Sequence, residues 1–388
     1  MVVNVGVESF TVPFSQPALD DLRDRLGRTR WPDAAPGKPW EYGFDREFLQ
    51  DLCRYWREEF DWKAQVERLS NFHHYRHTSD GVGIHFVHER GKGLNPIPLI
   101  MTHGWPGSFL EMLHIIPLLT DPAAHGGNAA DSFDVVIPSL PGFGFSNRPT
   151  MPGTNTFRIA DLWVKLMNTL GYHRFGAQGG DIGAAVSTIL GLRHPDRTLG
   201  VHLNYIPGSY RPHLRSEVPL TRKEEKFREC ARDWKEEKGA YAHLQSTRPQ
   251  TAAYGLNDSP AGLAAWIVEK FREWSDCAGD VYTRFTREEL LANVTLYWMT
   301  ETIHSSFRLY YEGRQAPLQF GPSDFVEVPC AIARFRKEEP FPPREWVERG
   351  YNVQRWTDMP RGGHFAAAEE PELLVHDIRS FFRKFRQQ

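Results

Sequence analysis

Residues 179–183 of this 388-residue chain read Gly179-Gly180-Asp181-Ile182-Gly183, and this stretch decides the fold. Small residues on both sides of an apex are typical of a sharp strand-to-helix turn, because the backbone there is strained and tightly packed. The preceding residues 174–178 can form the strand, and the run 184–190 can form the helix. An ordinary glycine-rich turn with an N-capping aspartate would look the same, so the prediction depends on partner residues elsewhere in the chain.

The apex residue, Asp181, sets the chemistry that we expect. A carboxylate is ionised at neutral pH and can act as a nucleophile without a base, but the ester that it forms must be hydrolysed by an activated water. These two steps suit epoxides and alkyl halides better than esters or amides. No G-x-S-x-G stretch occurs in the chain, which excludes a serine hydrolase with this turn.

Two loops carry the expected partners. Residues 103–107, His-Gly-Trp-Pro-Gly, follow an apolar run and should lie at the C-terminal end of a buried strand. In an α/β-hydrolase such a loop supplies one backbone N–H of the oxyanion hole, and the residue after the nucleophile supplies the other, so we assign these donors to Trp105 and Ile182. Late in the chain, His364 lies in a glycine-rich loop after the strand-like stretch 351–356, where this fold carries its base.

The acid that orients His364 has two candidate positions. After the strand that should follow the elbow helix, no acidic residue occurs until Glu217, so the first position is empty. After the stretch 328–335, Glu338 and Glu339 stand side by side, and one of them should accept a hydrogen bond from the imidazole. The resulting order of nucleophile, acid and histidine is the one that the α/β-hydrolase fold requires.

Six motifs resemble those of a known family. They are H-G-W-P-G-S-F at 103–109, P-G-F-G-F-S at 141–146, G-G-D-I-G at 179–183, S-T-R-P-Q-T at 246–251, D-S-P-A-G-L at 258–263 and G-G-H-F-A-A at 362–367. With them the chain is similar, over nearly its whole length, to the epoxide hydrolases of the microsomal type and their soluble fungal and bacterial relatives. These enzymes are ether-bond hydrolases that need neither a cofactor nor a metal, so the resemblance implies none here.

The resemblance also implies roles for single residues. The family's acid lies in an F-x-K-D/E loop, which selects Glu338 over Glu339. Two cap tyrosines that bind the epoxide oxygen map onto Tyr241 and Tyr310, with Tyr311 as an adjacent alternative. The implied reaction opens an epoxide to a vicinal diol, first through an ester on the nucleophile and then by attack of a histidine-activated water.

Other readings stay open from the sequence. Haloalkane dehalogenases share this fold but usually carry tryptophan directly after the nucleophile, where this chain has Ile182. A catalytically silent binding protein is an alternative from another class. Bacterial relatives serve detoxification, growth on epoxides or the tailoring of antibiotics such as enediynes, so the substrate could be an aryl epoxide; a homodimer is the candidate assembly.

The expected architecture is α/β, a mostly parallel sheet flanked by helices with a helical cap inserted in the core. The expected parts are an N-terminal extension at 1–93, a first core part at 94–207, the cap at 208–327 and a second core part at 328–388. Helices are predicted over 16–26, 45–67, 159–170, 222–238, 262–274, 287–311 and 372–388, and a hairpin pairs 72–77 with 84–88 through a turn at Asp80-Gly81.

The composition of the chain limits the kinds of binding partner that we expect. The net charge of −3 gives no reason to expect nucleic acid, and no stretch approaches about 18 apolar residues, so we expect no membrane span. The first residues lack a basic segment, so we expect neither a signal peptide nor a membrane anchor. Four scattered cysteines are typical of reduced thiols in the cytoplasm. We interpret the cluster His73, His74 and His77 as surface histidines rather than a metal site.

Overall fold

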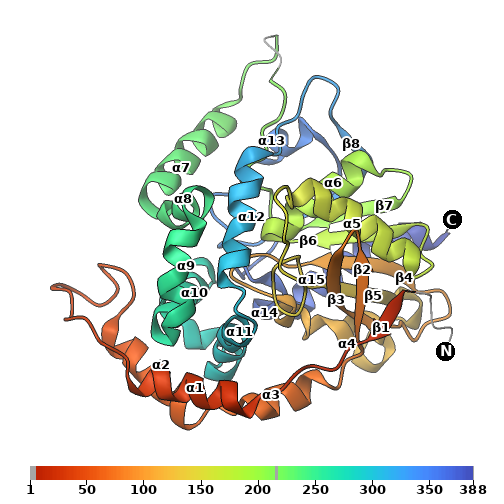
Figure 1. Cartoon of the computed structure of the whole chain (residues 1–388). Helices are drawn as coiled ribbons and strands as arrows, with labels where there is room; N and C mark the ends of the chain where they lie inside the picture. The colour runs from red at the N-terminus through yellow and green to blue at the C-terminus, as the bar shows by residue number, and fades with distance from the viewer. Residues whose placement is uncertain (1–5, 215–216, 388) are drawn as a thin grey trace.

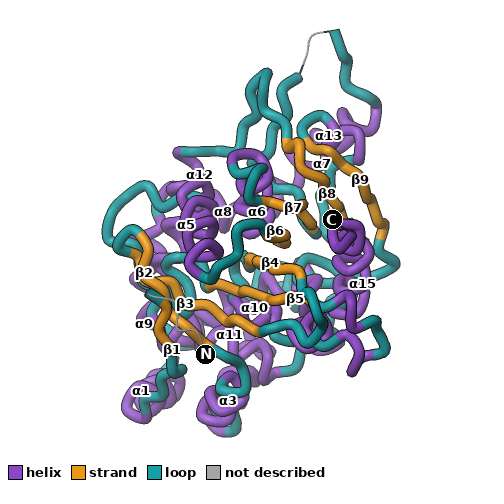
Figure 2. The backbone as a smooth tube through the Cα atoms, turned by 90° about the vertical axis from the view of Figure 1, so that its right-hand side faces the viewer, coloured by secondary structure: helices purple, strands orange, loops and turns teal. Residues whose placement is uncertain are grey.

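The structure is a computed structural model that describes residues 6–214 and 217–387. Its centre is a nine-stranded sheet in the order β1-β2-β3-β5-β4-β6-β7-β8-β9, which crosses the molecule in Figure 2. The strands are β1 Val7–Ser9, β2 His74–Ser79, β3 Val82–Glu89, β4 Ile97–Thr102, β5 Phe133–Pro138, β6 Phe175–Gly179, β7 Thr198–Leu203, β8 Val326–Arg334 and β9 Tyr351–Asp358. Neighbours from β5 to β9 run parallel, whereas β1, β2 and β3 extend the sheet with antiparallel pairs. The predicted α/β class with a mostly parallel sheet is confirmed.

The apolar sequences of the central strands explain why these strands are buried. Every residue of β5 and β6 is buried, as expected for parallel strands that are covered on both faces. Figure 2 shows α5 and α6 on one face of the sheet and α15 on the other, and α4 packs against β5 and α15. The core helices are α4 Ile115–Thr120, α5 Thr156–Thr169, α6 Asp181–Arg193, α13 Arg344–Glu348, α14 Ala366–Glu369 and α15 Pro371–Phe382.

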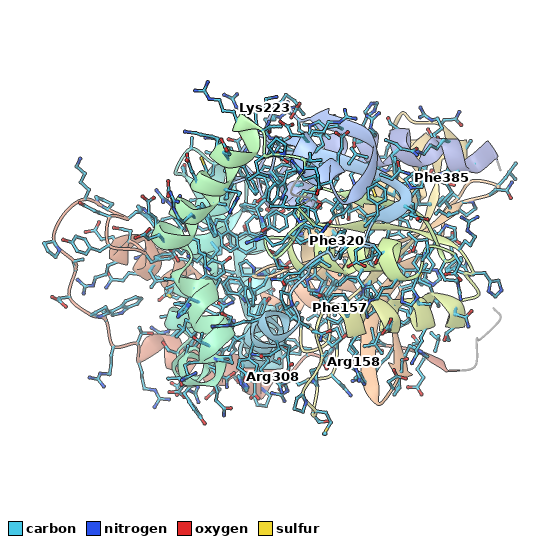
Figure 3. All side chains as sticks on the ribbon, turned by 90° about the horizontal axis from the view of Figure 1, so that it is seen from above. Phe157, Arg158, Lys223, Arg308, Phe320 and Phe385 are labelled. Carbon is cyan, nitrogen blue, oxygen red and sulfur yellow. The ribbon has the colours of Figure 1, made fainter. Side chains whose placement is uncertain are left out.

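A layer of helices lies between β7 and β8 in the chain and forms the cap at the left of Figure 1. Its members are α7 Arg222–Lys238, α8 Ala240–Thr247, α9 Pro249–Asp258, α10 Pro260–Trp274, α11 Arg287–Thr300 and α12 Ile303–Gln315. Figure 3 shows Arg308, on α12, between the cap helices and the strands, whereas Phe385 lies at the far end of the body. The guanidinium of Arg308 donates to the carbonyl oxygen of Pro149 at 2.9 Å, which ties the cap to the core.

The N-terminal helices pack beneath the cap in Figure 1. They are α1 Gln16–Gly27, α2 Arg46–Glu58 and α3 Trp62–Leu69. The indole N–H of Trp56 donates to Thr295 Oγ1 of α11 at 2.9 Å, and Arg287 of α11 pairs with Asp51 of α2 at 2.7 Å. Residues 6–93 therefore contact the cap and also contribute three strands to the central sheet.

Two long predicted helices are each divided in two. The predicted helix 45–67 breaks after Glu58, because Asp61 caps a new helix by accepting a hydrogen bond from the Ala64 amide at 3.1 Å. The predicted helix 287–311 breaks at Glu301, which adopts a left-handed conformation with φ of 51°. Both breaks are local capping events that an apolar period does not reveal.

Other differences are small. Helices α8 and α9 were not predicted, since their short sequences carry few apolar residues in a clear period. The predicted helix 372–388 ends at Phe382 and continues as a 3-10 turn, Arg383–Gln387, while residue 388 lies outside the described residues. The hairpin turn falls on Asp80-Gly81 as predicted, with positive φ at both residues.

The interpretation of the histidine cluster as a surface feature holds for His73, which is exposed, but is wrong for His74 and His77. Only 5% of His74 and 8% of His77 is exposed, and the His77 ring lies 2.7 Å from the Gly6 carbonyl oxygen. The ring of His74 lies 2.9 Å from His85 Nε2 and 2.8 Å from the Leu69 carbonyl oxygen. Satisfied hydrogen bonds of this kind explain how imidazoles can be buried in a core.

Candidate active site

The nucleophile elbow is formed as a tight junction between β6 and α6. Asp181 lies at its apex with φ of +47°, a left-handed conformation that costs on the order of 1–3 kcal/mol outside glycine. Two residues later, a Cβ on Gly183 would collide with the carbonyl oxygen of Thr102. The small residues of the motif are therefore required by close packing, and the strain holds the carboxylate at the C-terminal edge of the sheet.

One oxygen of this carboxylate is already bound by the loop after β4. The backbone N–H of Trp105 donates to Asp181 Oδ1 at 2.8 Å. Ile182, the second residue assigned to the oxyanion hole, follows directly in the first turn of α6. The same amide that binds a carboxylate oxygen can stabilise the oxyanion of an ester under attack.

The structure brings the predicted histidine and acid to the other oxygen. His364 Nε2 lies 3.7 Å from Asp181 Oδ2, and His364 Nδ1 lies 2.8 Å from Glu338 Oε2. Glu338 is 6% exposed, whereas the adjacent Glu339 points to solvent. Of the two glutamates that the sequence left open, Glu338 is the one in contact with the imidazole.

Negative charge around His364 controls its protonation. Burial by itself would lower the pKa of the imidazole, but the Glu338 carboxylate, followed by Asp181 and Glu111, outweighs burial and raises this pKa to about 9. The imidazole is therefore protonated at neutral pH. Any loss of the negative charge around it favours the neutral ring.

The loop that carries His364 is fixed by groups that the sequence did not identify. The backbone N–H of His364 donates to the Trp274 carbonyl oxygen of the cap at 3.0 Å. The Glu369 carboxylate accepts from the Gly363 and Phe365 amides, each at 3.0 Å, and burial raises its pKa to about 7. The sequence feature that could have identified Glu369 is its place as the acidic residue at the end of the small and apolar stretch Ala366–Glu369.

The two predicted tyrosines come from different cap helices and meet over Trp105. Tyr241 of α8 stacks on the Trp105 indole with ring centres 5.4 Å apart, and Tyr310 of α12 packs edge-on against it at 5.8 Å. Their own rings lie 6.1 Å apart. Tyr311 is 43% exposed on the other side of α12, so the structure brings Tyr310 rather than Tyr311 to this cluster.

Burial keeps both phenols protonated. Burial and then the Asp181 charge raise the pKa of Tyr241 well above its usual value, and burial also raises the pKa of Tyr310. A protonated phenol can donate a hydrogen bond to an oxygen that gains negative charge. Lys270, which the sequence did not single out, lies 5.0 Å from the Tyr241 ring centre and is 6% exposed.

Neither a metal-binding cluster nor a membrane-spanning helix occurs among the described residues. Within the part of the chain that the structure describes, no three His, Cys, Asp or Glu side chains gather closely enough to hold a metal ion. Across residues 6–214 and 217–387, no helix is both long and apolar enough to cross a bilayer. All four cysteines are free thiols, and three of them are buried.

Comparison with known proteins gives matches along the whole chain. Residues 7–112 match the family model described as the epoxide hydrolase N terminus, and residues 97–299 match the alpha/beta hydrolase fold. A Stigmatella aurantiaca protein named for epoxide hydrolysis is 44% identical over 98% of this chain and 86% of its own length. Epoxide hydrolase 1 of Oryctolagus cuniculus is 38% identical over 97% of this chain and 88% of its own.

A solved structure agrees with these matches. The epoxide hydrolase of Aspergillus niger superposes with a TM-score of 0.83 at 30% identity, covering 98% of this chain and 97% of that one.

Proposed function

This chain belongs to the epoxide hydrolase family, and from that premise we propose that it opens epoxides to vicinal diols through an ester on Asp181. One observation carries the proposal. The Asp181 carboxylate at the strained apex has one oxygen on the Trp105 amide and the other facing His364, whose far nitrogen contacts Glu338. A nucleophile, a base and an orienting acid are thus aligned in contact with one another.

The first step is attack of Asp181 on an epoxide carbon. A bond forms between a carboxylate oxygen and that carbon while the bond from the carbon to the epoxide oxygen breaks. Tyr241 and Tyr310 hydrogen-bond to the oxygen as it becomes an alkoxide, which then takes up a proton. At neutral pH His364 carries an extra proton, and it can supply this proton to the alkoxide through the tyrosines or solvent.

The second step hydrolyses the ester. Esterification removes the charge of Asp181, so the pKa of His364 falls and the ring can accept a proton from water. The water oxygen bonds to Asp181 Cγ, and the Trp105 and Ile182 amides stabilise the oxyanion. Collapse breaks the bond between Cγ and the alkyl oxygen, the second proton of the water passes to that oxygen, and the diol is released with the carboxylate restored. The proton that His364 takes from the water makes up for the one that it gave up in the first step.

The walls of the site suggest the class of substrate. The rings of Tyr241, Trp274 and Phe307 all contact the ring of Trp105, whose backbone amide binds the nucleophile Asp181. We propose an aryl epoxide, because offset and edge-on ring contacts favour another ring. A role in detoxification or in antibiotic biosynthesis, a homodimeric assembly and a cytoplasmic location belong to the same proposal, and they rest on the sequence.

A substrate panel tests the proposal. We expect diol formation from styrene oxide to exceed that from linear aliphatic epoxides, measured by chiral chromatography. Turnover of 1-chlorobutane with halide release but no diol formation from any epoxide would contradict the proposed reaction. Preference for aliphatic epoxides would contradict only the aryl substrate.

A further inference from the structure

A small cavity borders the reacting atoms of the second step. It has room of about 20 Å³ for water, and its walls include Gly104, Gly107, Glu111, Asp181 and His364. A cavity needs roughly 10–15 Å³ of such room for one water. The space next to the nucleophile and the base therefore fits one water, and Tyr241 and Tyr310 do not line it.

Glu111 is the one carboxyl in this wall that the mechanism above does not use; the amides of Gln178 and Asn204 also line the cavity and hydrogen-bond to each other at 2.9 Å. It lies in the 3-10 turn Phe109–Met112, and its carboxylate sits where a Cβ on Gly107 would be. Part of its side-chain surface stays uncovered by protein atoms. Burial, reinforced by the Asp181 charge, raises its pKa to about 8 despite the opposing charge of His364. Glu111 is thus partly buried and lies within electrostatic reach of the nucleophile and the base.

The cap holds the turn that carries Glu111. The Tyr297 hydroxyl donates to the Gly107 carbonyl oxygen at 2.8 Å, and Asn293 Nδ2 donates to the Pro106 carbonyl oxygen at 2.8 Å. Both donors come from α11. The carboxyl is therefore positioned by fixed backbone, which favours a defined geometry for a bound water.

Glu111 also borders a second cavity, of about 60 Å³, between α3, α11 and the 3-10 turn. Trp62, Arg68, His114 and Glu289 are among its lining residues. Among the described residues, Glu111 alone lines both cavities. Neither cavity is lined by Tyr241 or Tyr310, so both lie apart from the groups that would bind the epoxide oxygen.

A purely structural role for Glu111 is a poor explanation. Placing a carboxyl inside a protein costs several kcal/mol unless it is well paired. The favourable partners of the Glu111 carboxyl are a backbone hydrogen bond with Gly104 and the charge of His364, and no Arg or Lys is among the groups that shift its pKa. An apolar side chain of the same length would fill this position at lower cost. The position is better explained by a polar ligand that the carboxyl binds.

We propose that Glu111 binds the water that hydrolyses the Asp181 ester and orients it between His364 and Asp181 Cγ. This inference rests on the proposed function. The water gives one proton to His364 Nε2 and directs its second O–H at a Glu111 oxygen, so that a lone pair faces Cγ. The C–O bond then forms as described above, and Glu111 ends the cycle in the protonation state in which it began.

Two substitutions at this position test the proposal. Glu111→Met fills the same length without a polar acceptor, and Glu111→Gln keeps one acceptor oxygen. In rapid-mixing experiments with styrene oxide, Glu111→Met should slow ester hydrolysis about ten- to a hundredfold while alkylation stays within about twofold. Glu111→Gln should lie between Glu111→Met and the wild type. Alkylated enzyme should accumulate in the Met variant, as detected by intact mass.

Glu289→Gln is the matched control, because Glu289 lines the second cavity but not the first. Both of its rates should match the wild type. Thermal unfolding adds an independent readout, since Glu111→Met should be at least as stable as the wild type once a buried carboxyl is removed. Equal slowing of both steps together with lower stability would overturn the proposal in favour of a structural role.

Failure of this inference differs from failure of the proposed function. If the wild type forms an adduct and Glu111→Met hydrolyses it at the wild-type rate, Glu111 does not bind the water. If no enzyme form is ever alkylated, the ester mechanism itself is wrong. A crystal structure of the wild type gives a second test: an ordered water in contact with both Glu111 and His364 supports the proposal, and its absence contradicts it.

Discussion

The sheet edge and the cap hold their reactive groups by different means. At the sheet edge Asp181, Glu338 and His364 are fixed by a strained turn, charge and hydrogen bonds. In the cap Tyr241 and Tyr310 are held mainly by stacked and edge-on rings around Trp105. Charged groups can change protonation between steps, whereas buried phenols stay neutral donors.

This difference assigns the two regions to different steps of the proposed reaction. The cap tyrosines act on the epoxide oxygen only while the ring opens. The acid and the base act on the water only after the ester has formed, and the nucleophile takes part in both steps. Substitutions in the two regions should therefore separate alkylation from hydrolysis.

The largest effect is expected at the residue that both steps share. Asp181→Ala removes the nucleophile and should lower diol formation by at least about a thousandfold. The melting temperature should stay near that of the wild type, because the residue's contacts are few and its backbone is strained. Steady-state assays and circular dichroism measure both quantities. Ordinary diol production by this variant would rule out the covalent mechanism.

The acid should come next. Glu338→Gln removes the charge that stabilises the protonated imidazole, and ester hydrolysis should slow about a hundredfold or more while alkylation changes less. Glu339→Gln is the control, because Glu339 is exposed and should stay within a few-fold of the wild type. Single-turnover kinetics measures the two rates. The opposite ranking of the two variants would move the acid to Glu339.

Substitutions in the cap should affect the other step. Tyr241→Phe and Tyr310→Phe should each slow alkylation about ten- to a hundredfold, because the alkoxide loses one donor. Hydrolysis of the ester should be unchanged, so no adduct should accumulate. Tyr311→Phe provides the control, with rates like those of the wild type. Accumulation of the adduct in Tyr241→Phe or Tyr310→Phe would contradict the assignment of the cap to alkylation and of the sheet edge to hydrolysis.

The sequence predicted these two regions to different degrees. Asp181, His364 and the Trp105 loop could be located because the elbow, the glycines and the strand ends obey steric rules that a few letters record. The residues alone could not choose between Glu338 and Glu339, since both occupy one loop and only the fold turns one of them toward His364. The resemblance to a family, and not periodicity, supplied Tyr241 and Tyr310.

What escaped prediction depends on contacts between distant segments. Glu111 is a single acidic residue in an apolar stretch and Glu369 is the first of two adjacent glutamates after three alanines, and their neighbours become visible only once the loops after β4 and β9 meet. The breaks at Asp61 and Glu301 are set by one cap and one left-handed residue, which do not alter the apolar period around them.

The smallest expected effect concerns the stability of the cap. Glu289 caps α11, and its hydrogen bond with His114, together with the Thr286 contacts, lowers its pKa to about 2. A carboxyl with a folded-state pKa below its unfolded value stabilises the fold above about pH 4.5, and this contribution is lost as pH falls toward 2. Glu289→Gln should therefore cost on the order of 1 kcal/mol at pH 7 and almost nothing near pH 2. Urea unfolding at both pH values measures the difference, and a cost that does not change with pH would exclude the charge as its cause.

The most direct test of the ester on Asp181 uses the base. His364→Gln leaves the nucleophile and both tyrosines in place, so the variant should react once with styrene oxide and then stop. Intact-mass spectrometry should find one added substrate mass per chain, and peptide mapping should locate it on Asp181. An unmodified chain under conditions in which the wild type forms diol would contradict the proposed covalent mechanism.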